Sequence, residues 1–262
     1  MVEVLISCMH QVDYSIIEKS NLKEECALVI NQCNTETDEI TRITNNHRMV
    51  KTNTRGLSVS RNMAIKYAKG DICVISDDDE VFVDSLSSVI ETAYKENPNA
   101  DVIIFNLGNR HQKLGVKKKW LKKYELLRVA SWQITFRRSS VLDKIWFDEK
   151  LGAGTGNGGG EENKFLFDCK REGLKILYVP VIIAQGIEDA PSTWFFGYDD
   201  EYFLKLGCVL RYLLGSVVGF LYCIYTIFTK RNLYKKDISA FSALKNILRG
   251  FFDERLEKID VK

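Results

Sequence analysis

Histidine is scarce in this sequence, and its cysteines form no metal-binding pattern. There are three histidines and seven cysteines, and no two cysteines stand in a C-x-x-C pair. An odd number of cysteines, most of them inside apolar runs, does not fit a framework of disulfide bonds. We therefore exclude a zinc-ribbon or disulfide-stapled protein, and we expect buried thiols in a reducing compartment.

A strong charge of one sign is also absent. The sequence has 37 basic residues against 35 acidic ones, which leaves a formal net charge of +2. This balance argues against a protein that coats nucleic acid, and we expect no nucleic-acid partner. One stretch departs from the balance, because residues 110–128 contain six lysines and the single acid Glu125. Such a stretch either attracts a polyanionic or lipid-phosphate acceptor or is a solvated surface.

No signal-peptide pattern precedes the first apolar run. Met1 is followed at once by residues 2–7, VEVLIS, which have the composition of a strand. This leaves no basic segment followed by a longer apolar segment and a cleavage site. We therefore expect the protein to remain in the cytoplasm.

Short apolar runs rich in β-branched residues are typical of strands, and four of them occupy residues 2–7, 27–32, 71–76 and 101–106. Longer polar or helical stretches separate them, including a helix predicted over 61–70 and ended by Gly70. This alternation indicates a mainly parallel sheet with helices on both faces. We predict an α/β sandwich, because 262 residues with 45% hydrophobic content can bury a sizeable core.

Three consecutive aspartates, Asp77, Asp78 and Asp79, follow the third of these runs. Open α/β sheets bind ligands in the crevice beyond the carboxyl ends of their strands. Three adjacent carboxylates repel one another, and Mg²⁺ or Mn²⁺ would relieve this repulsion while also binding the phosphates of a ligand. The alternative is a solvated turn or helix cap.

The segment RGLSVSRN, residues 55–62, lies at the start of the predicted helix. Arg55 and Arg61 carry charges that suit phosphate, and Gly56 permits close approach of the backbone. A helix N-terminus also favours anions. These features predict a phosphate site, with an ordinary capped helix and solvated arginines as the alternative.

Residues 152–160, GAGTGNGGG, are too rich in glycine for a helix or a strand. A helix is predicted directly after them, over 161–173, and it begins with Glu161 and Glu162. We expect a mobile loop that leads into this helix.

These motifs, taken in order, resemble a known family. GLSVSRN, a helix, KGDICVISDDD and, about 80 residues later, GGGEEN are similar to the motifs of the family 2 glycosyltransferases. The resemblance implies the nucleotide-sugar-binding fold called GT-A. It covers residues 2–202, so we expect a GT-A catalytic domain over 1–202 and a carboxyl-terminal helical segment over 203–262.

The resemblance also implies roles for the acidic residues. In the family, the D-x-D aspartates hold Mn²⁺ or Mg²⁺ on the donor diphosphate, and by match these are Asp77 and Asp79, with Asp78 between them. The acidic pair after the glycine-rich loop supplies the base that deprotonates the acceptor, which falls on Glu162, with Glu161 as the alternative. Glu162 stands where relatives usually have Asp. The implied reaction is an in-line displacement that inverts the anomeric carbon.

Further residues are implied to contact the nucleotide-sugar donor, and these are Ser7, Asn31, Arg55, Gly56, Arg61, Asp77 and Asp78. Where many relatives have a carboxylate after the second strand, this chain has Asn31 and Gln32. Their amides suit uracil, so a UDP-sugar is favoured. Trp132 and Trp194 are candidates for walls that stack on a sugar.

The uncharged run 212–229 would extend about 27 Å as one helix, close to the roughly 30 Å of a bilayer core. Basic residues flank both ends, so their charge gives no orientation. Insertion into the membrane surface or a re-entrant insertion is favoured, while a full span and burial in a subunit interface or against the catalytic domain stay open. A further helix is predicted within residues 237–259.

The family resemblance and this apolar run indicate which partners the protein is expected to have. We expect a glycan or lipid-linked saccharide acceptor in cell-surface polysaccharide synthesis, at the inner face of the cell membrane, and a homo-oligomer is compatible with the sequence. Two alternatives stay open. One is a nucleotidyltransferase, which would break the α–β phosphate bond, and the other is a non-catalytic partner of a synthase that binds nucleotide-sugar or glycan.

Overall fold

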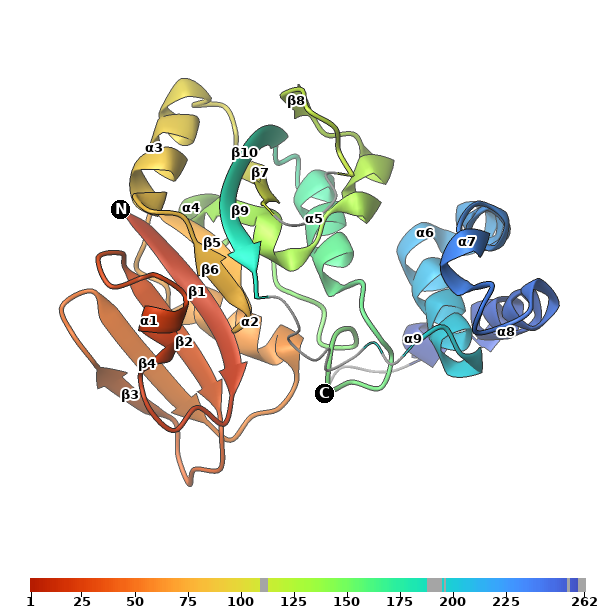
Figure 1. Ribbon diagram of the computed structural model, residues 1–262, viewed down its shortest axis with the longest axis horizontal. Helices are drawn as coiled ribbons and strands as arrows, with labels where there is room; N and C mark the ends of the chain where they lie inside the picture. The colour runs from red at the N-terminus through yellow and green to blue at the C-terminus, as the bar shows by residue number, and fades with distance from the viewer. Residues whose placement is uncertain (109–112, 188–194, 196, 254, 259–262) are drawn as a thin grey trace. The chain divides into compact units, whose positions relative to one another are not determined.

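The computed structural model describes residues 1–262 except 109–112, 188–194, 196, 254 and 259–262 (Figure 1). The chain divides into two compact units. Unit 1 comprises residues 1–147 and 165–190, and unit 2 comprises residues 148–164 and 191–262. The chain passes between the units three times, so neither unit is a simple half of the sequence.

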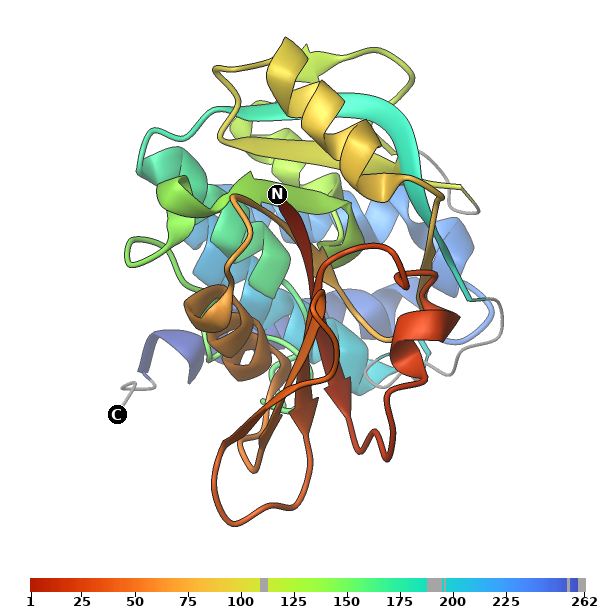
Figure 2. The ribbon, with the colours of Figure 1, turned by 90° about the vertical axis from the view of Figure 1, so that its left-hand side faces the viewer.

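Unit 1 is built on one mixed sheet, whose strands follow the order β3-β4-β2-β1-β5-β9-β7-β10-β6, with β8 paired to β10. The strands are β1 (Val2–Met9), β2 (Ala27–Gln32), β3 (Glu39–Arg42), β4 (His47–Thr52), β5 (Ile72–Ser76), β6 (Glu80–Phe82), β7 (Val102–Leu107), β8 (Lys119–Trp120), β9 (Ile134–Arg137) and β10 (Ile176–Gly186). Figure 2 shows the red and orange strands of the amino-terminal part side by side.

Six of these strands, β4, β2, β1, β5, β7 and β10, run in the same direction. The remaining ones are antiparallel to their neighbours, and β9 lies between β5 and β7. The predicted α/β fold is therefore confirmed. Because six carboxyl ends share one edge, residues that follow β1, β2, β4 and β5 are brought together there.

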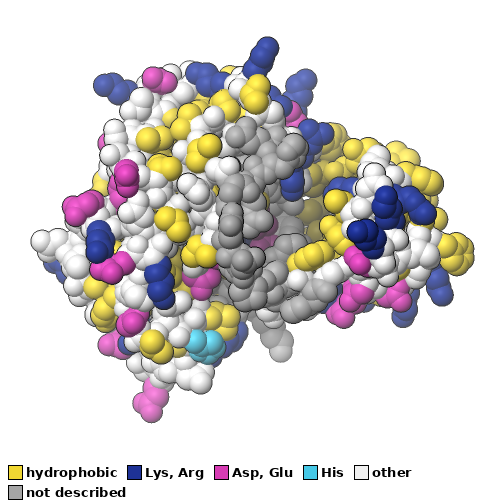
Figure 3. All heavy atoms as spheres, in the orientation of Figure 1, with side chains coloured by type: hydrophobic (Ala, Val, Ile, Leu, Met, Phe, Trp, Pro, Cys, Tyr) yellow, Lys and Arg dark blue, Asp and Glu magenta, His cyan; other side chains and the backbone are white. Residues whose placement is uncertain are grey.

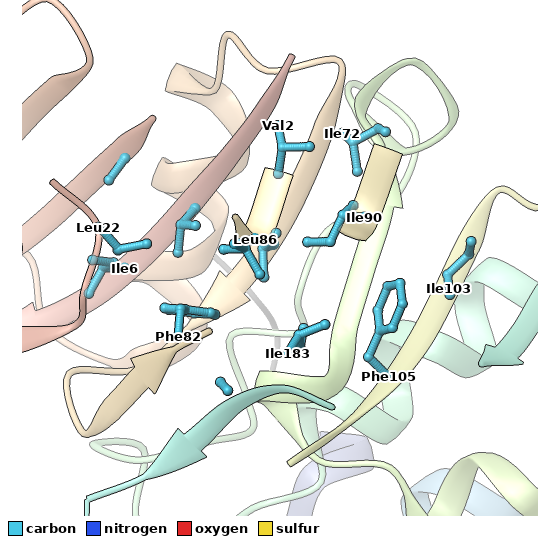
Figure 4. Packing of buried hydrophobic residues seen from close by; sticks show 14 of the residues in the cluster. Val2, Ile6, Leu22, Ile72, Phe82, Leu86, Ile90, Ile103, Phe105 and Ile183 are labelled. Atoms are coloured by element: carbon cyan, nitrogen blue, oxygen red, sulfur yellow. The ribbon is translucent and has the colours of Figure 1, made fainter. Parts of the chain in front are cut away.

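The sheet is covered on both faces because its central strands are apolar on both. In β1, Val2 and Ile6 belong to a core that includes Leu86 and Ile90 of helix α3 (Leu86–Glu96), and Figure 4 shows these side chains beside one another. Leu5 of the same strand is also buried, and alternation places it on the opposite face. There α2 (Leu57–Tyr67) packs against β1 and β2.

The short helices of unit 1 connect the strands, and they are α1 (Ile16–Lys19), η1 (Lys123–Arg128), η2 (Ser131–Gln133) and α4 (Arg138–Val141). Helix α5 (Glu161–Arg171) begins in unit 2 and ends in unit 1. The helix expected over 61–70 instead runs from Leu57 to Tyr67, because burial of its first turn overrides the weak helix propensity of Ser and Val.

Gly70 does not end that helix as expected. A Cβ atom at Gly70 would lie 2.6 Å from the Cβ of Glu3, so only glycine fits beside β1. The backbone amides of Lys69 and Gly70 donate to the Glu3 carboxylate at 2.6 and 2.8 Å, and Arg48 donates to it at 2.6 Å. Glycine at this position lets the backbone approach Glu3 closely enough to donate hydrogen bonds to its buried carboxylate.

Unit 2 contains α6 (Asp200–Thr229), α7 (Arg231–Tyr234), α8 (Ala240–Asp253) and α9 (Arg255–Lys258), so the helix predicted within 237–259 is divided in two. By length and composition alone, α6 could cross a membrane, which is weak support for a span. Gly215, however, has φ 73° and ψ −175°, which are not helical angles.

The break at Gly215 folds α6 back on itself. A Cβ atom at Gly219 would lie 2.8 Å from the carbonyl oxygen of Leu210. In a straight helix, residues nine positions apart are separated by about 13.5 Å along the axis. Residues 212–229 therefore do not form one uninterrupted helix, and α6 is a hairpin whose arms are residues 200–214 and 216–229.

Helix α8 closes this hairpin by direct contact between backbones. Cβ atoms at Gly207 and Gly250 would lie 2.0 and 1.8 Å from the carbonyl oxygens of Ile247 and Leu204. Glycine at both positions allows α6 and α8 to approach more closely than any other residue permits. The arms and α8 share a core that includes Phe203, Cys223 and Phe251.

Candidate functional site

The acidic triplet lies at the edge of the sheet where strand carboxyl ends meet. Asp77, Asp78 and Asp79 occupy the turn between β5 and β6. Burial, and then the negative charge of Asp78, raise the pKa of the Cys8 thiol near the end of β1. The triplet thus lies close enough to the end of β1 for the charge of Asp78 to act on Cys8, in keeping with its position after a strand.

Asp77 is held by two side chains from distant parts of unit 1. One guanidinium nitrogen of Arg61, on α2, lies 2.9 and 3.2 Å from the two carboxylate oxygens of Asp77. The hydroxyl of Ser131, on η2, donates to the same carboxylate at 3.0 Å. The Arg61 side chain is only 1% exposed and lies over the ring of Phe147, with 5.3 Å from Cζ to the ring centroid.

This burial changes the interpretation of Arg61. The sequence predicted a guanidinium at the helix N-terminus facing phosphate, whereas Arg61 lies in the second turn of α2 and binds an acidic side chain of its own chain. Its charge neutralises one of the three aspartates. The triplet therefore presents less negative charge to a ligand than its sequence suggests.

Two acidic residues of this turn, Asp78 and Glu80, have raised pKa values. Partial burial, and then the charges of Asp77 and Asp79, raise the pKa of Asp78. Glu80, the next residue after the triplet, is fully buried, and its pKa is raised well above its ordinary value, chiefly by loss of water and then by Asp77. Its Oε2 lies 2.7 Å from the hydroxyl of Ser76. Burial and the neighbouring acids therefore favour the protonated form of Glu80.

Asn31 and Gln32, at the end of β2, are buried and hydrogen-bonded within the protein. The Asn31 amide donates to the carbonyl oxygen of Gln11 at 2.8 Å and accepts from the backbone amide of Gln11 at 3.0 Å. Gln32 donates to Thr54 and to the carbonyl oxygen of Gly56. These amides fix the loops after β1 and β4, so a contact of Asn31 with a base would require exchange of these bonds.

Arg55 and Gly56 shape the loop between β4 and α2. Arg55 is exposed, and its guanidinium donates to the carbonyl oxygens of Asn53 and Thr54 at 2.8 Å and to the side chain of Asn34 at 2.7 Å. Gly56 has φ 104°, which only glycine adopts readily, and it precedes α2. Arg55 thus joins the loops after β2 and β4 at the same edge of the sheet.

Ser7 is the remaining predicted contact of the donor in this unit. It is buried on β1, and its hydroxyl accepts from that of Ser60 on α2 at 2.9 Å. The structure therefore brings the residues around β1, β2, β4 and β5 to one edge, but most of their polar groups already bond to one another.

A metal at this edge would have to be held jointly by protein and ligand. Within the described part of the chain, no three His, Cys, Asp or Glu side chains converge closely enough to hold a metal ion. Mg²⁺ is commonly held by one or two carboxylates and completed by water and substrate phosphates. The raised pKa of Asp78 shows that negative charge is disfavoured in this turn, which a divalent cation would relieve. The acidic turn fits a cation held in this way.

Glu161 and Glu162 are the first residues of α5 and belong to unit 2. Glu161 is buried, whereas Glu162 is partly exposed. The glycine-rich segment before them has positive φ at every second residue, namely Gly152, Gly154, Gly156, Gly158 and Gly160. This alternation explains its glycine content, because other residues rarely adopt such angles.

The segment that was expected to be a mobile loop is internally hydrogen-bonded. The amide of Gly152 donates to the carbonyl oxygen of Gly158 at 2.8 Å, and the side chain of Asn157 donates to the carbonyl oxygen of Lys150 at 3.0 Å. It is thus a closed loop that leads directly into α5.

Sequence reasoning missed two residues of the site. Ser131 carries no signal in the sequence, because it reaches Asp77 only through the fold. Glu80 extends the run of acids in the sequence and could have been noticed. Of the two predicted sugar-stacking residues, Trp132 packs against the core of unit 1, and Trp194 lies outside the described residues.

Comparisons with known proteins agree with this fold. The family model described as Glycosyl transferase family 2 matches residues 14–146, which is just over half of the chain. No curated protein matches the chain. The matched residues include the acidic triplet and the loop that contains Arg55 and Gly56.

Solved structures share the fold. S. aureus TarS 1–349 has 15% sequence identity and a TM-score of 0.61, and its complex with UDP-GlcNAc has 14% identity and a TM-score of 0.64. Each match covers 98% of this chain and 82% of that chain. A further S. aureus TarS structure gives a TM-score of 0.54 and 15% identity, over 98% of this chain and 44% of that one.

Proposed function

Because the chain belongs to glycosyl transferase family 2, we propose that it transfers a sugar from a nucleotide-diphosphate sugar to a glycan or lipid-linked acceptor. A UDP-sugar is the favoured donor, the class of ligand bound to TarS in one structure of the same fold. The observation that carries the proposal is the acidic turn between β5 and β6, placed at the carboxyl edge of the sheet with Asp77 held by Arg61 and Ser131.

We assign Asp79 and Asp77 as the residues that would hold Mn²⁺ or Mg²⁺ with the donor diphosphate. When bound, such an ion neutralises charge that develops on the departing nucleoside diphosphate. Arg61 and Ser131 fix the orientation of Asp77, so little reorganisation is needed when the donor arrives. Asp78 lies between them as a further contact for the donor.

Glu162 is the proposed base, and its partial exposure suits an acceptor better than the burial of Glu161. Its carboxylate takes the proton of the acceptor hydroxyl as that oxygen forms a bond to the anomeric carbon. The bond from this carbon to the phosphate oxygen breaks with its electron pair on the leaving nucleoside diphosphate. The displacement inverts the anomeric carbon.

We also propose that the protein works in the cytoplasm, peripherally at the inner face of the cell membrane, in the synthesis of a cell-surface polysaccharide. Such a place suits a transferase whose acceptor is carried on a lipid. Support comes from the apolar helices of unit 2 rather than from the donor site.

The test is release of nucleoside diphosphate from a panel of UDP-, GDP- and dTDP-sugars in Mn²⁺, Mg²⁺ or EDTA. We expect release from one donor that needs the metal and falls at least about a hundredfold in Asp79→Asn. With an acceptor present, Glu162→Gln should lose transfer by roughly a hundredfold or more while keeping donor binding. Glu149→Gln, outside the proposed site on the same segment of unit 2, is the matched control.

Each alternative predicts a different product. Pyrophosphate released from a nucleoside triphosphate and a sugar phosphate would indicate a nucleotidyltransferase. Donor binding measured by calorimetry without turnover, and unaffected by Glu162→Gln, would indicate a non-catalytic partner. Either result would overturn the proposed transfer.

A further inference from the structure

The second arm of α6, residues 216–229, is apolar on all sides. Its inner side buries Cys223 and Ile227 in the core of unit 2. On the other side, Val217, Leu221 and Phe228 are 75%, 62% and 71% exposed. With 3.6 residues per turn these three lie within about 40° of one another on the helix surface. The second arm is apolar all round but packs against the protein on one side only, so its other apolar side is left exposed.

Helix α8 extends this exposed surface. Phe241 and Phe252 are 78% and 66% exposed, and they lie about 20° apart on the helix. The rings of Phe220 and Phe252 both pack against the ring of Phe251, with centroid distances of 5.8 and 5.2 Å. Phe220 of α6 and Phe252 of α8 therefore contact the same buried ring. We call this surface the apolar face, and it comprises Val217, Phe220, Leu221, Tyr225, Phe228, Phe241 and Phe252.

Basic residues follow the α6 part of the apolar face in the sequence, and on α8 Lys245 lies within about 40° of Phe241 on the helix surface. Immediately after the second arm come Lys230, Arg231, Lys235 and Lys236, with Asp237 as the one acid among residues 230–237. Lys245 and Arg249 are exposed on α8. In Figure 3, yellow hydrophobic and dark blue basic side chains lie over the part of the surface formed by these helices, with magenta acidic side chains along its lower side. The pattern is that of helices that lie in a membrane interface.

We propose that the apolar face inserts into the headgroup region of an anionic lipid bilayer and that unit 2 binds the membrane in plane, without spanning it. The inference rests on the membrane location proposed above and names the surface responsible. The second arm would measure about 21 Å, which is too short to cross a core of roughly 30 Å. The turn at Gly215 returns the chain to the side from which it came.

Charge favours lipid over a second copy of the chain. In a two-fold symmetric dimer the same patch faces itself, so the basic residues around the two apolar faces would approach each other. Lysine is also depleted at protein interfaces. Anionic headgroups instead complement these charges, at about a fivefold gain in affinity per basic residue near the surface.

The test is flotation of the full chain with vesicles of phosphatidylcholine alone or mixed with phosphatidylglycerol. We expect binding to the mixed vesicles, and a roughly tenfold or greater loss of binding in Leu221→Ser/Phe228→Ser. Val12→Ser/Ile40→Ser, which removes two exposed apolar side chains from unit 1, is the matched control and should bind as the wild type does. Circular dichroism checks that each variant is folded.

A second variant tests the charges without changing the apolar face. Lys235→Glu/Lys236→Glu should weaken binding to the mixed vesicles by roughly tenfold or more, and high salt should weaken wild-type binding. If Leu221→Ser/Phe228→Ser does not fold, the Lys235→Glu/Lys236→Glu variant tests the proposal instead. Wild-type chain that stays in solution with both vesicles would overturn the proposal.

Two further outcomes also count against it. A wild-type dimer in light scattering that Leu221→Ser/Phe228→Ser dissociates would make the face a subunit interface. Resistance of the membrane-bound protein to extraction at alkaline pH would indicate a span. Donor hydrolysis without vesicles is measured on the same samples. Wild-type chain that hydrolyses the donor but does not bind vesicles rejects this inference alone, and wild-type chain that binds vesicles but does not hydrolyse any donor rejects only the proposed chemistry.

Discussion

The guanidinium of Arg61 lies 2.9 Å from one carboxylate oxygen of Asp77 and is buried by the ring of Phe147. Asp77 is thus a structural partner as well as a candidate ligand for a metal. Asp79, two residues later, belongs to the same acidic turn. Substitution of Asp77 is therefore expected to change the stability of the protein as well as its activity.

Asp77→Asn should destabilise the protein by about 3 kcal/mol, because it leaves the buried Arg61 charge without its carboxylate. The exposed Asp38→Asn is the control, with an expected change within about 0.5 kcal/mol. Urea unfolding of both variants in EDTA measures the difference. Equal stability losses would mean that Arg61 does not depend on Asp77.

Glu80→Gln should remove a pH dependence of stability. The pKa of Glu80 in the folded protein is raised above its ordinary value of 4.5. Between these two pKa values the folded state binds more protons than the unfolded state, so the free energy of unfolding falls as pH rises. The amide of Glu80→Gln does not titrate, so the free energy of unfolding of the variant should increase relative to that of the wild type as pH rises. Unfolding free energies between about pH 4.5 and 9 check this, and a constant difference across that range would contradict it.

Asn31→Asp should lower the free energy of unfolding by about 2 kcal/mol or more, because the carboxylate cannot donate to the Gln11 carbonyl and is buried. The exposed Asn53→Asp is the control, with an expected change within about 0.5 kcal/mol. Unfolding curves and the donor KM are both measured. A changed KM at unchanged stability would instead assign Asn31 to recognition of the base.

Gly207→Ala should destabilise unit 2 by about 2 kcal/mol or more, because its Cβ would lie 2.0 Å from the carbonyl oxygen of Ile247. The greater helix propensity of alanine offsets only part of this cost. The comparison is Ser216→Ala, at an exposed position of α6. Thermal unfolding and limited proteolysis of both variants measure the effect, and equal melting temperatures would show that α6 and α8 can separate without loss.

Much of the fold follows from short apolar runs. Strands β1, β2, β5 and β7 were predicted within two residues because they are continuous hydrophobic segments. Strand β9 was not predicted, since nothing local indicates that it pairs between β5 and β7. The break at Gly215 was also missed, because an uncharged run reads the same whether its helix is straight or folded back.

The sequence predicted where the acidic residues lie in the fold better than it predicted which side chains they bond to. The position of Asp77, Asp78 and Asp79 after a strand was sufficient to place them at the edge of the sheet. Their partners were not predictable, because Ser131 is separated from Asp77 by 54 residues and approaches it through tertiary structure alone. The burial of Arg61 and Asn31 likewise depends on packing that single motifs do not encode.

The segment that leads to Glu161 and Glu162 is packed on the first arm of α6. Leu151 is buried with Cys208 and Val209, and the hydroxyl of Tyr212 donates to Asp148 at 2.5 Å. A chain shortened before α6 would therefore lose the support of the proposed base together with its membrane contact. If both proposals hold, the same helices would support substrate turnover and attachment to the bilayer.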